Sequence, residues 1–180
     1  MNTPPADTDV PASPNPLTHL DDHGRAAMVD VGAKPETPRR AVAVGHLAMG
    51  ASAMAQVLDG RNAKGDLLAV ARVAGVMAAK RTSDLIPLCH PLPLTSVSVE
   101  FEASPAAGRV EVRATAETVG RTGVEMEALC AASLALLTLY DMLKAVDKTM
   151  AMGGVRVVRK EGGRSGTWIA EEPGSRGPDN

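Results

Sequence analysis

The chain has 180 residues, 44% of them hydrophobic and 22% charged, which is enough for one folded domain with a substantial core. Its 19 Lys and Arg and 21 Asp and Glu residues give a formal net charge of −2, which argues against bulk DNA or RNA binding. One Phe, one Trp and one Tyr offer few rings for base stacking, and two cysteines are too few for a disulfide framework.

Residues 1–16 are rich in Pro and contain little that could be buried, which predicts a disordered tail. Residues 169–180 predict a second disordered tail, so residues 17–168 are expected to form a single domain. No apolar signal segment is visible, and the longest apolar run, 128–140, is too short to span a bilayer. We therefore expect a cytoplasmic protein with reduced thiols and no membrane partner.

The first half of the domain predicts one strand and two helices. Residues 40–49 predict the strand, and residues 50–59 predict a short helix that ends at Gly60. A longer helix is expected over 66–80, with Asp66 as its N-cap. No linker or internal repeat interrupts this part of the chain.

The second half predicts a hairpin, a long helix and a last strand. Residues 95–103 and 110–118 alternate apolar and polar side chains, which predicts two antiparallel strands. A long apolar helix is expected over 123–150, followed by a break at 153–154 and a strand at 155–159. The order of elements predicts an α+β, ferredoxin-like fold, with helices packed on a mostly antiparallel sheet.

The predicted long helix carries few polar side chains. Thr122 and Glu125 fit a capping box, in which case Glu125 only caps the helix. Four polar residues fall within about 100° of the helix circumference: Glu127, Asp141, Lys144 and Lys148. They form either a solvated stripe of ion pairs or a pocket for proton transfer, in which neighbouring cations lower the pKa of Lys144 toward neutrality.

Residues 80–93 contain Cys89 and His90 in a Pro-rich stretch that predicts an extended, rigid loop. Such a loop presents backbone groups to ligands, so His90 is either bonded to backbone or placed at a ligand site. A metal site built on Cys89 and His90 is disfavoured, because adjacent residues of an extended chain point to opposite sides and no partner has metal-ligand spacing.

Several cations lie beside Gly or Pro and are expected in loops: Lys34, Arg39, Arg40, Lys64, Arg159 and Lys160. Lys64 and Gly65 come directly before a predicted helix N-terminus, where phosphate binds favourably. The sequence here does not match a P-loop. Each cation alone reads as a solvated surface residue, whereas their joint placement indicates an anion site.

Five motifs occur in one order: KGD at 64–66, AKRT at 79–82, DLIPLCHPL at 84–92, TGVEMEA at 122–128, and YDM followed by KAV at 140–146. Together they resemble the cyclic pyranopterin monophosphate synthase family, the MoaC-type proteins of molybdenum cofactor biosynthesis. The resemblance extends over about residues 17–166, nearly the whole expected domain.

The resemblance implies a lyase whose catalytic domain is residues 17–168. It implies conversion of (8S)-3′,8-cyclo-7,8-dihydroguanosine 5′-triphosphate to cyclic pyranopterin monophosphate, with release of pyrophosphate. It also implies a homohexamer, a trimer of dimers with active sites at subunit interfaces. No cofactor is required, although Mg²⁺ can accompany the triphosphate.

The resemblance also implies roles for individual residues. Asp141 and Lys144 are the expected catalytic residues. The expected substrate-binding residues are Leu88, Cys89, His90, Met126, Glu127, Lys64, Lys34, Arg39 and Lys160. The residues alone leave two alternatives open, namely a non-catalytic nucleotide-binding oligomer and a metal-dependent phosphohydrolase built on Cys89 and His90.

Overall fold

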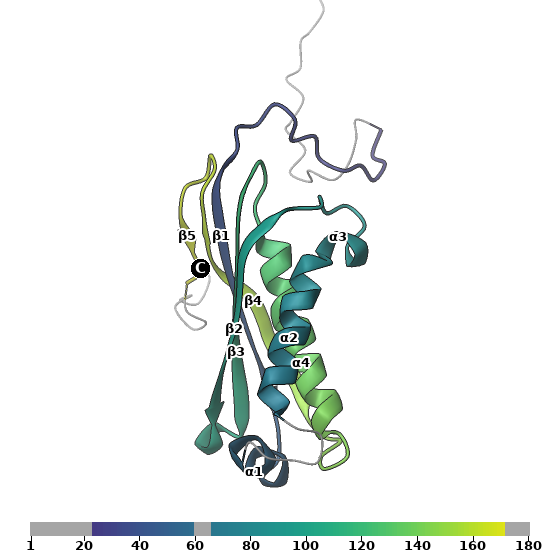
Figure 1. The fold of residues 1–180 in the computed structure, drawn as a ribbon, viewed down its shortest axis with the longest axis vertical. Helices are drawn as coiled ribbons and strands as arrows, with labels where there is room; N and C mark the ends of the chain where they lie inside the picture. Colours follow the sequence, from purple (N-terminus) through teal and green to yellow (C-terminus); the bar gives the residue numbers. More distant parts are fainter. Residues whose placement is uncertain (1–22, 60–65, 172–180) are drawn as a thin grey trace, which may run out of the picture.

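The computed structural model describes residues 23–59 and 66–171, and Figure 1 shows how their helices and strands are arranged. The expected tail at 1–16, most of the expected tail at 169–180 and the expected phosphate ligand Lys64 lie outside the described residues. The described part forms two layers, with a β-sheet on one side and two long helices on the other (Figure 1).

One sheet of five antiparallel strands forms the first layer, in the order β2-β3-β1-β4-β5. The strands are β1 (Thr37–Ala48), β2 (Leu94–Ser104), β3 (Arg109–Gly120), β4 (Ala151–Glu161) and β5 (Trp168–Ile169). β2 and β3 form the predicted hairpin, in which Gly108 turns the chain with a φ of 61°. The strands predicted at 40–49, 95–103 and 110–118 are therefore confirmed, with boundaries shifted by a few residues.

Two long helices form the second layer and lie on one face of the sheet (Figure 1). The helices are α1 (Ala51–Asp59), α2 (Leu67–Lys80), α3 (Thr82–Leu85) and α4 (Glu125–Leu143), with a 3-10 turn at Pro105–Ala107. α2 and α4 pack antiparallel to each other (Figure 1). A Cβ on Gly75 of α2 would lie 2.8 Å from the carbonyl oxygen of Ala131, so glycine permits this close packing. The architecture confirms the ferredoxin-like α+β fold.

The core lies between the helices and one face of the sheet. Alternate residues of β3 are buried on this face: Val110, Val112, Ala114 and Ala116. At the start of α2, the Asp66 carboxylate accepts a hydrogen bond of 2.9 Å from the backbone N–H of Ala69, which confirms the predicted N-cap. The layers thus follow from the period-two pattern of the strands and the caps of the helices.

β4 begins earlier than predicted. A strand was expected at 155–159 after a break at 153–154, but β4 runs through both glycines. Gly154 has a φ of 63°, and the register between β1 and β4 shifts near this point. A Cβ on Gly153 would lie 2.8 Å from Nε2 of His46 on β1. The glycines therefore allow a bulge inside the strand and do not end it.

α4 starts later than the predicted helix at 123–150. Its N-cap position is Val124, whose side chain cannot accept a hydrogen bond, so the predicted capping box of Thr122 and Glu125 is not formed. The Glu125 carboxylate instead lies 3.3 Å from the Nζ atom of Lys160 on β4.

α4 also ends earlier than predicted, at Leu143. After Lys144 the chain turns, and the Asp147 carboxylate accepts hydrogen bonds from both the backbone N–H and the hydroxyl of Thr149. These local bonds compete with helix continuation. Lys148 consequently lies outside the helix, and the predicted stripe of four polar residues is not formed.

α4 is long and apolar enough to cross a membrane by length and composition, with a mean hydropathy of 1.5 over its most apolar window. Within the fold it packs against α2 on one side and against β1 and β3 on another. Half of that window is buried inside the domain. α4 is therefore packed as a core helix of the domain. Core helices and membrane-spanning helices can have the same length and composition, so these two properties alone do not indicate a membrane.

Candidate functional site

A cavity rich in cations opens at one end of the sheet, beside the start of α4. Its volume is about 790 Å³. Six cations line it: Lys34, Arg39, Arg40, Arg121, Lys160 and Arg164. Three of them, Lys34, Arg39 and Lys160, are expected phosphate ligands, and the structure brings them together from distant parts of the sequence. We call this space the cation-lined cavity.

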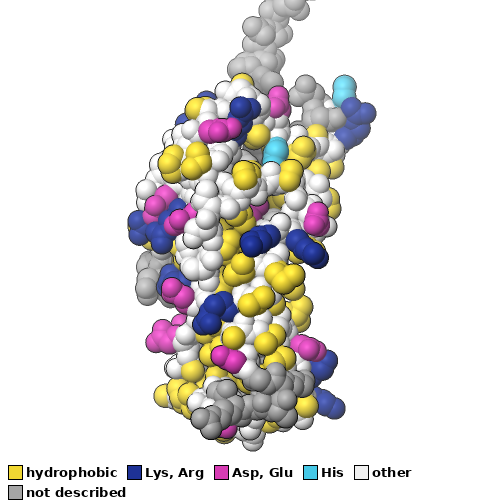
Figure 2. Space-filling model, in the orientation of Figure 1, with side chains coloured by type: hydrophobic (Ala, Val, Ile, Leu, Met, Phe, Trp, Pro, Cys, Tyr) yellow, Lys and Arg dark blue, Asp and Glu magenta, His cyan; other side chains and the backbone are white. Residues whose placement is uncertain are grey.

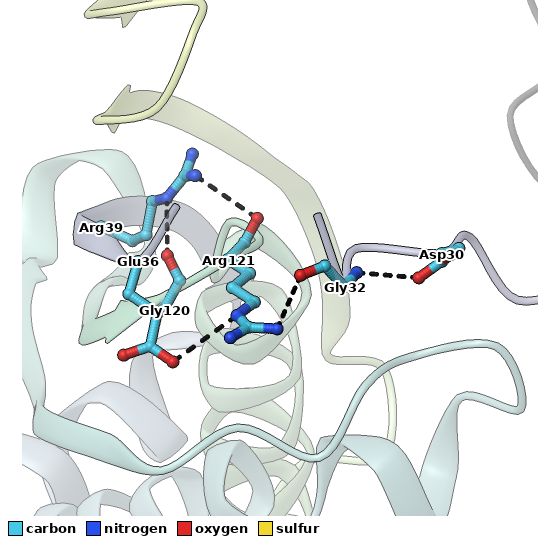
Figure 3. A network of polar contacts seen from close by, with 6 residues as sticks. All are labelled: Asp30, Gly32, Glu36, Arg39, Gly120 and Arg121. Carbon is cyan, nitrogen blue, oxygen red and sulfur yellow. Dashed lines mark hydrogen bonds and ion pairs between the residues drawn. The ribbon is translucent and has the colours of Figure 1, made fainter. Parts of the chain in front are cut away.

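Strands hold three of these six cations, which corrects the expectation that they lie in loops. Arg39 and Arg40 belong to β1, and Lys160 belongs to β4. The Arg39 guanidinium donates to the carbonyl oxygens of Gly120 (3.3 Å) and Arg121 (3.4 Å), as Figure 3 shows. The placement of Arg39 is therefore set by the backbone at the end of β3.

Arg121 ties the segment before β1 to this end of the sheet (Figure 3). Its guanidinium donates to the carbonyl oxygen of Gly32 at 2.8 Å and lies 3.6 Å from the Glu36 carboxylate. The Gly32 N–H in turn donates to the Asp30 carboxylate at 2.8 Å. These contacts fix the segment on both sides of Lys34. Our sequence reasoning missed Arg121, although it directly precedes the TGVEMEA motif.

Two acidic residues in the first turn of α4 lie at the same end of the domain. Glu125 lines the cation-lined cavity, while Glu127 is only 4% exposed. Burial, and secondarily the nearby Glu125 charge, raise the pKa of Glu127, against a smaller opposing effect of a backbone hydrogen bond. Met126 between them is half-buried. Glu127 is therefore suited to carry a proton near the site.

Burial of Glu127 leads to a prediction about stability. Because its folded-state pKa lies above the ordinary value of 4.5, the folded protein binds more protons than the unfolded chain just above pH 4.5. Its ionisation therefore costs stability as the pH rises toward neutrality. We expect Glu127→Gln to raise the melting temperature by about 2–4 °C at pH 7, the effect of about 1 kcal/mol in a domain of this size.

The same comparison at acidic pH is the control. Below pH 4.5 both the folded and the unfolded chain hold the proton on Glu127, so parent and Glu127→Gln should melt together. Thermal scans of both proteins from pH 4 to pH 8 measure the difference. A gain in melting temperature that did not change with pH would contradict a raised pKa of Glu127.

The sequence predicted an extended, rigid loop around Cys89 and His90. In the structure a helical turn, α3, occupies Thr82–Leu85, residues 87–88 form a turn, and residues 89–93 have no helix or strand. Burial, then the charge of Glu127 and the neighbouring Cys130, raise the pKa of the Cys89 thiol. Cys89 is thus poorly suited to act as a thiolate nucleophile or metal ligand.

His90 connects this loop to the segment before β1. Its Nε2 atom lies 2.8 Å from the carbonyl oxygen of Val29, so this nitrogen carries a hydrogen and donates it. When the imidazole is neutral, Nδ1 is therefore the nitrogen with a free lone pair. Leu88, two residues earlier, is half-buried.

The expected catalytic residues lie at the other end of α4. The Nζ atom of Lys144 donates to the Asp141 carboxylate at 2.6 Å. Both side chains are largely exposed, Asp141 by 64% and Lys144 by 55%. The hydrogen bond with Asp141, and then its charge, raise the pKa of Lys144, which contradicts the expected lowering. The Asp141–Lys144 pair therefore joins a carboxylate to an ammonium group that keeps its proton.

Asp147 organises the loop that follows this pair. Its carboxylate accepts hydrogen bonds from Thr149 and, at 2.8 Å, from the backbone N–H of Gly50 before α1. These three hydrogen bonds lower the pKa of Asp147. Our sequence reasoning missed Asp147, although an Asp two residues before a Thr is a known turn signal.

The two groups of site residues are well separated within one chain. Glu125 and Asp141 occupy the first turn and the last turn of α4, which places them about 24 Å apart at a rise of about 1.5 Å per residue. Catalytic hydrogen bonds span only about 3 Å. One chain therefore cannot bring the cation-lined cavity and the Asp141–Lys144 pair to the same reacting atoms.

Comparisons with a family model and with individual known proteins indicate the same family. A family model described as the MoaC family matches residues 28–163, which includes every expected site residue. A Brucella melitensis protein named cyclic pyranopterin monophosphate synthase is 57% identical over 159 residues, or 88% of this chain and 96% of the relative. A Thermomicrobium roseum protein of the same name is 57% identical over 160 residues, or 89% of this chain and 96% of the relative.

Proposed function

Because the chain belongs to the MoaC family and functions as a cyclic pyranopterin monophosphate synthase in molybdenum cofactor biosynthesis, we propose that its two groups of site residues act together across two copies of the chain. The substrate is (8S)-3′,8-cyclo-7,8-dihydroguanosine 5′-triphosphate. The products are cyclic pyranopterin monophosphate and pyrophosphate. One copy supplies the cation-lined cavity, and the other supplies the Asp141–Lys144 pair.

The separation of the two groups carries this proposal. The Asp141–Lys144 pair is exposed and lies about 24 Å along α4 from Glu125 at the cation-lined cavity. A catalytic acid–base pair needs a site that excludes bulk water. A second copy that covers the pair with its own cavity would bring the two groups together and would also exclude bulk water from the pair.

The charges match the chemistry of the substrate. A triphosphate needs several cations, and Lys34, Arg39 and Lys160 line the same cavity. When a ribose hydroxyl oxygen bonds to the α-phosphorus, its proton passes to a general base and the bond from that phosphorus to the pyrophosphate oxygen breaks. Pyrophosphate leaves with the electron pair, and the cations stabilise the negative charge that develops on it.

The Asp141–Lys144 pair matches the rearrangement of the guanine-derived ring. Opening and reclosing the ring requires protons to be removed and returned. The Asp141 carboxylate accepts a proton, while the Lys144 ammonium group donates one or stabilises a developing negative charge. Glu127, with its raised pKa, is a second proton donor on the cavity side.

The proposal assigns no protein-bound cofactor, and any Mg²⁺ enters with the triphosphate. Among the described residues, no three His, Cys, Asp or Glu side chains lie close enough together to hold a metal. A homohexamer and a cytoplasmic location remain predictions. Self-association is supported by apolar residues at the surface of the helix layer (Figure 2), among them Val70, Val73 and Met77 of α2.

Pyrophosphate release tests the activity directly. The purified protein is mixed with the cyclised GTP derivative, and pyrophosphate and the pterin product are quantified. Release of both in equal amounts is expected. Tight binding of the substrate without either product would instead favour a non-catalytic nucleotide-binding oligomer.

Lys34 provides a test of the cation-lined cavity. A charge-assisted contact with phosphate contributes about 1.5–3 kcal/mol, so Lys34→Ala should weaken substrate binding by about one to two decades. Lys34 is exposed, so the melting temperature should change little. Calorimetric titration measures the affinity, and Arg109→Ala, an exposed cation on β3 that does not line this cavity, is the control. Equal affinity in Lys34→Ala and the parent would rule out the phosphate role.

A further inference from the structure

The six cations of the cation-lined cavity differ in whether the chain itself neutralises them. Three of them pair with carboxylates of the chain: Arg40 with Glu117, Arg121 with Glu36, and Lys160 with Glu125. The other three, Lys34, Arg39 and Arg164, form no ion pair among residues 23–59 and 66–171. Their charges are therefore available to a bound anion. Of these three, Arg164 is not among the expected phosphate ligands.

Lys34 and Arg164 lie at the same end of the sheet, next to neighbouring strands. β1 and β4 pair antiparallel, with Arg40 opposite Glu161, so the start of β1 lies beside the end of β4. Lys34 comes three residues before β1, and Arg164 comes three residues after β4. Figure 1 shows the turn between β4 and β5 at this end, beside β1. Both side chains are exposed, so they lie at the rim of the cavity.

Glycines shape the loop that carries Arg164 between β4 and β5. The Gly162 N–H donates to the carbonyl oxygen of Gly166 at 3.0 Å, and the Gly166 N–H donates to that of Gly163 at 3.3 Å. All three glycines have a positive φ, between 63° and 98°. The second hydrogen bond closes a β-turn with Arg164 and Ser165 as its central residues. The backbone thus holds the loop, and the Arg164 side chain takes no part in these bonds.

The same loop rests on Arg39. A Cβ on Gly163 would overlap the Arg39 guanidinium, so only glycine allows this contact without displacing the arginine. On its other contacts the guanidinium donates to two backbone carbonyls at the end of β3. Arg164 directly follows Gly163 and is consequently held close to Arg39. Two neighbouring cations repel each other, and an anion bound between them relieves this repulsion.

We propose that Arg164 binds the outer phosphates of the substrate, those that leave as pyrophosphate, and thereby makes the enzyme selective for a triphosphate. A guanidinium presents a planar fork of donors that matches two phosphate oxygens. This inference rests on the proposed function and goes beyond it, because it assigns one further residue and the part of the substrate that this residue recognises.

The depth of the cations in the cavity supports the outer position. The α-phosphate is the reacting group, so it must lie near the groups that transfer protons. Lys160 is placed to hold it, since its ammonium group lies 3.3 Å from the Glu125 carboxylate in the first turn of α4. The outer phosphates then extend away from α4 toward the rim, where Arg164 is exposed.

GTP and GMP are suitable probes, because they share the guanine ring, the ribose and the α-phosphate and differ only in the outer phosphates. Arg164→Ala should weaken the binding of GTP by roughly 10- to 100-fold and that of GMP by less than about threefold. Arg164→Lys should recover part of the GTP affinity, because it keeps the charge but loses the planar fork. Calorimetric titration at constant ionic strength measures all affinities.

Two controls accompany the titrations. The Arg164 side chain is exposed and lies in a loop, so the melting temperature of Arg164→Ala should match that of the parent. Arg109→Ala, which removes an exposed arginine of β3 that does not line this cavity, should bind GTP as the parent does. With the cyclised substrate, kcat/KM of Arg164→Ala should fall by a factor similar to the loss of GTP affinity.

The outcomes separate this inference from the proposed function. Unchanged GTP affinity in folded Arg164→Ala would overturn the phosphate role of Arg164, and so would a parent that binds GTP no more tightly than GMP. Equal losses for GTP and GMP would overturn the assignment to the outer phosphates. A parent that binds GTP through Arg164 but releases no pyrophosphate from the cyclised substrate would overturn the proposed function and leave the recognition of outer phosphates standing.

Discussion

Asp141→Asn is expected to lower turnover by about 10²–10⁴-fold, the usual contribution of one general acid or base. The amide keeps the shape of the carboxylate but cannot accept a proton at neutral pH. Lys144→Ala should have an effect of similar size, since it removes the ammonium group that lies 2.6 Å from the Asp141 carboxylate. The double variant should be little slower than the slower single variant, because the two residues act as a unit.

The measurement combines turnover and stability on the same samples. Both side chains are largely exposed, so the melting temperature should change little while pyrophosphate release falls. Lys148→Ala is the matched control, since this lysine lies close in sequence but outside α4. Activity of folded Asp141→Asn within about threefold of the parent would contradict the acid–base role.

The pH dependence of turnover should follow the direction of the pKa shift of Lys144. The hydrogen bond and charge of Asp141 raise this pKa above its ordinary value of 10.5, so Lys144 stays protonated throughout the neutral range. An alkaline loss of activity caused by Lys144 should therefore appear only at pH values above that ordinary value.

Most of the fold could be predicted because its signals are local. The alternation of apolar and polar side chains in β2 and β3 can be recognised from neighbouring residues alone. The Asp66 N-cap can be recognised from Asp66 and the three residues that follow it. The predicted C-terminal end of α4 was wrong because it too was taken from a local pattern. Apolar residues continue past Leu143, which favoured a longer helix, but the hydrogen bonds between Asp147 and Thr149 form a turn there instead.

The arrangement of the site could be predicted only in part. The sequence indicated which cations are expected to bind anions. Their approach to one another depends on the pairing of β1 and β4 in the sheet, a contact between residues far apart in the chain. The lowered pKa expected for Lys144 assumed that Lys148 lies on the same helix face, whereas the structure leaves Asp141 as its dominant neighbour. Periodicity gives the face of a helix, whereas the rise of about 1.5 Å per residue already separates Glu127 from Asp141 by about 21 Å along α4, so these two residues could not share one pocket.

Mixing two inactive variants should restore activity if the site is shared between copies. Asp141→Asn removes the proposed catalytic carboxylate, and Lys160→Glu reverses a charge in the cation-lined cavity. After subunit exchange at equal amounts, one site in about four combines an intact cavity from one chain with an intact Asp141–Lys144 pair from another, because each half is intact with even odds. The mixture should therefore reach about a quarter of the parent's activity, although each variant alone is at least about tenfold slower.

A second mixture distinguishes a shared site from one contained in a single chain. When the parent is mixed with a chain that carries both substitutions, a shared site is intact only if both contributing chains are parental, again about one in four. A site within one chain would stay intact in every parental chain, which gives about half of the parent's activity per total chain. Separate proteins kept from exchanging subunits are the control. No recovery in the first mixture together with half activity in the second would show that one chain contains the whole active site, and would overturn the proposal that two copies share it.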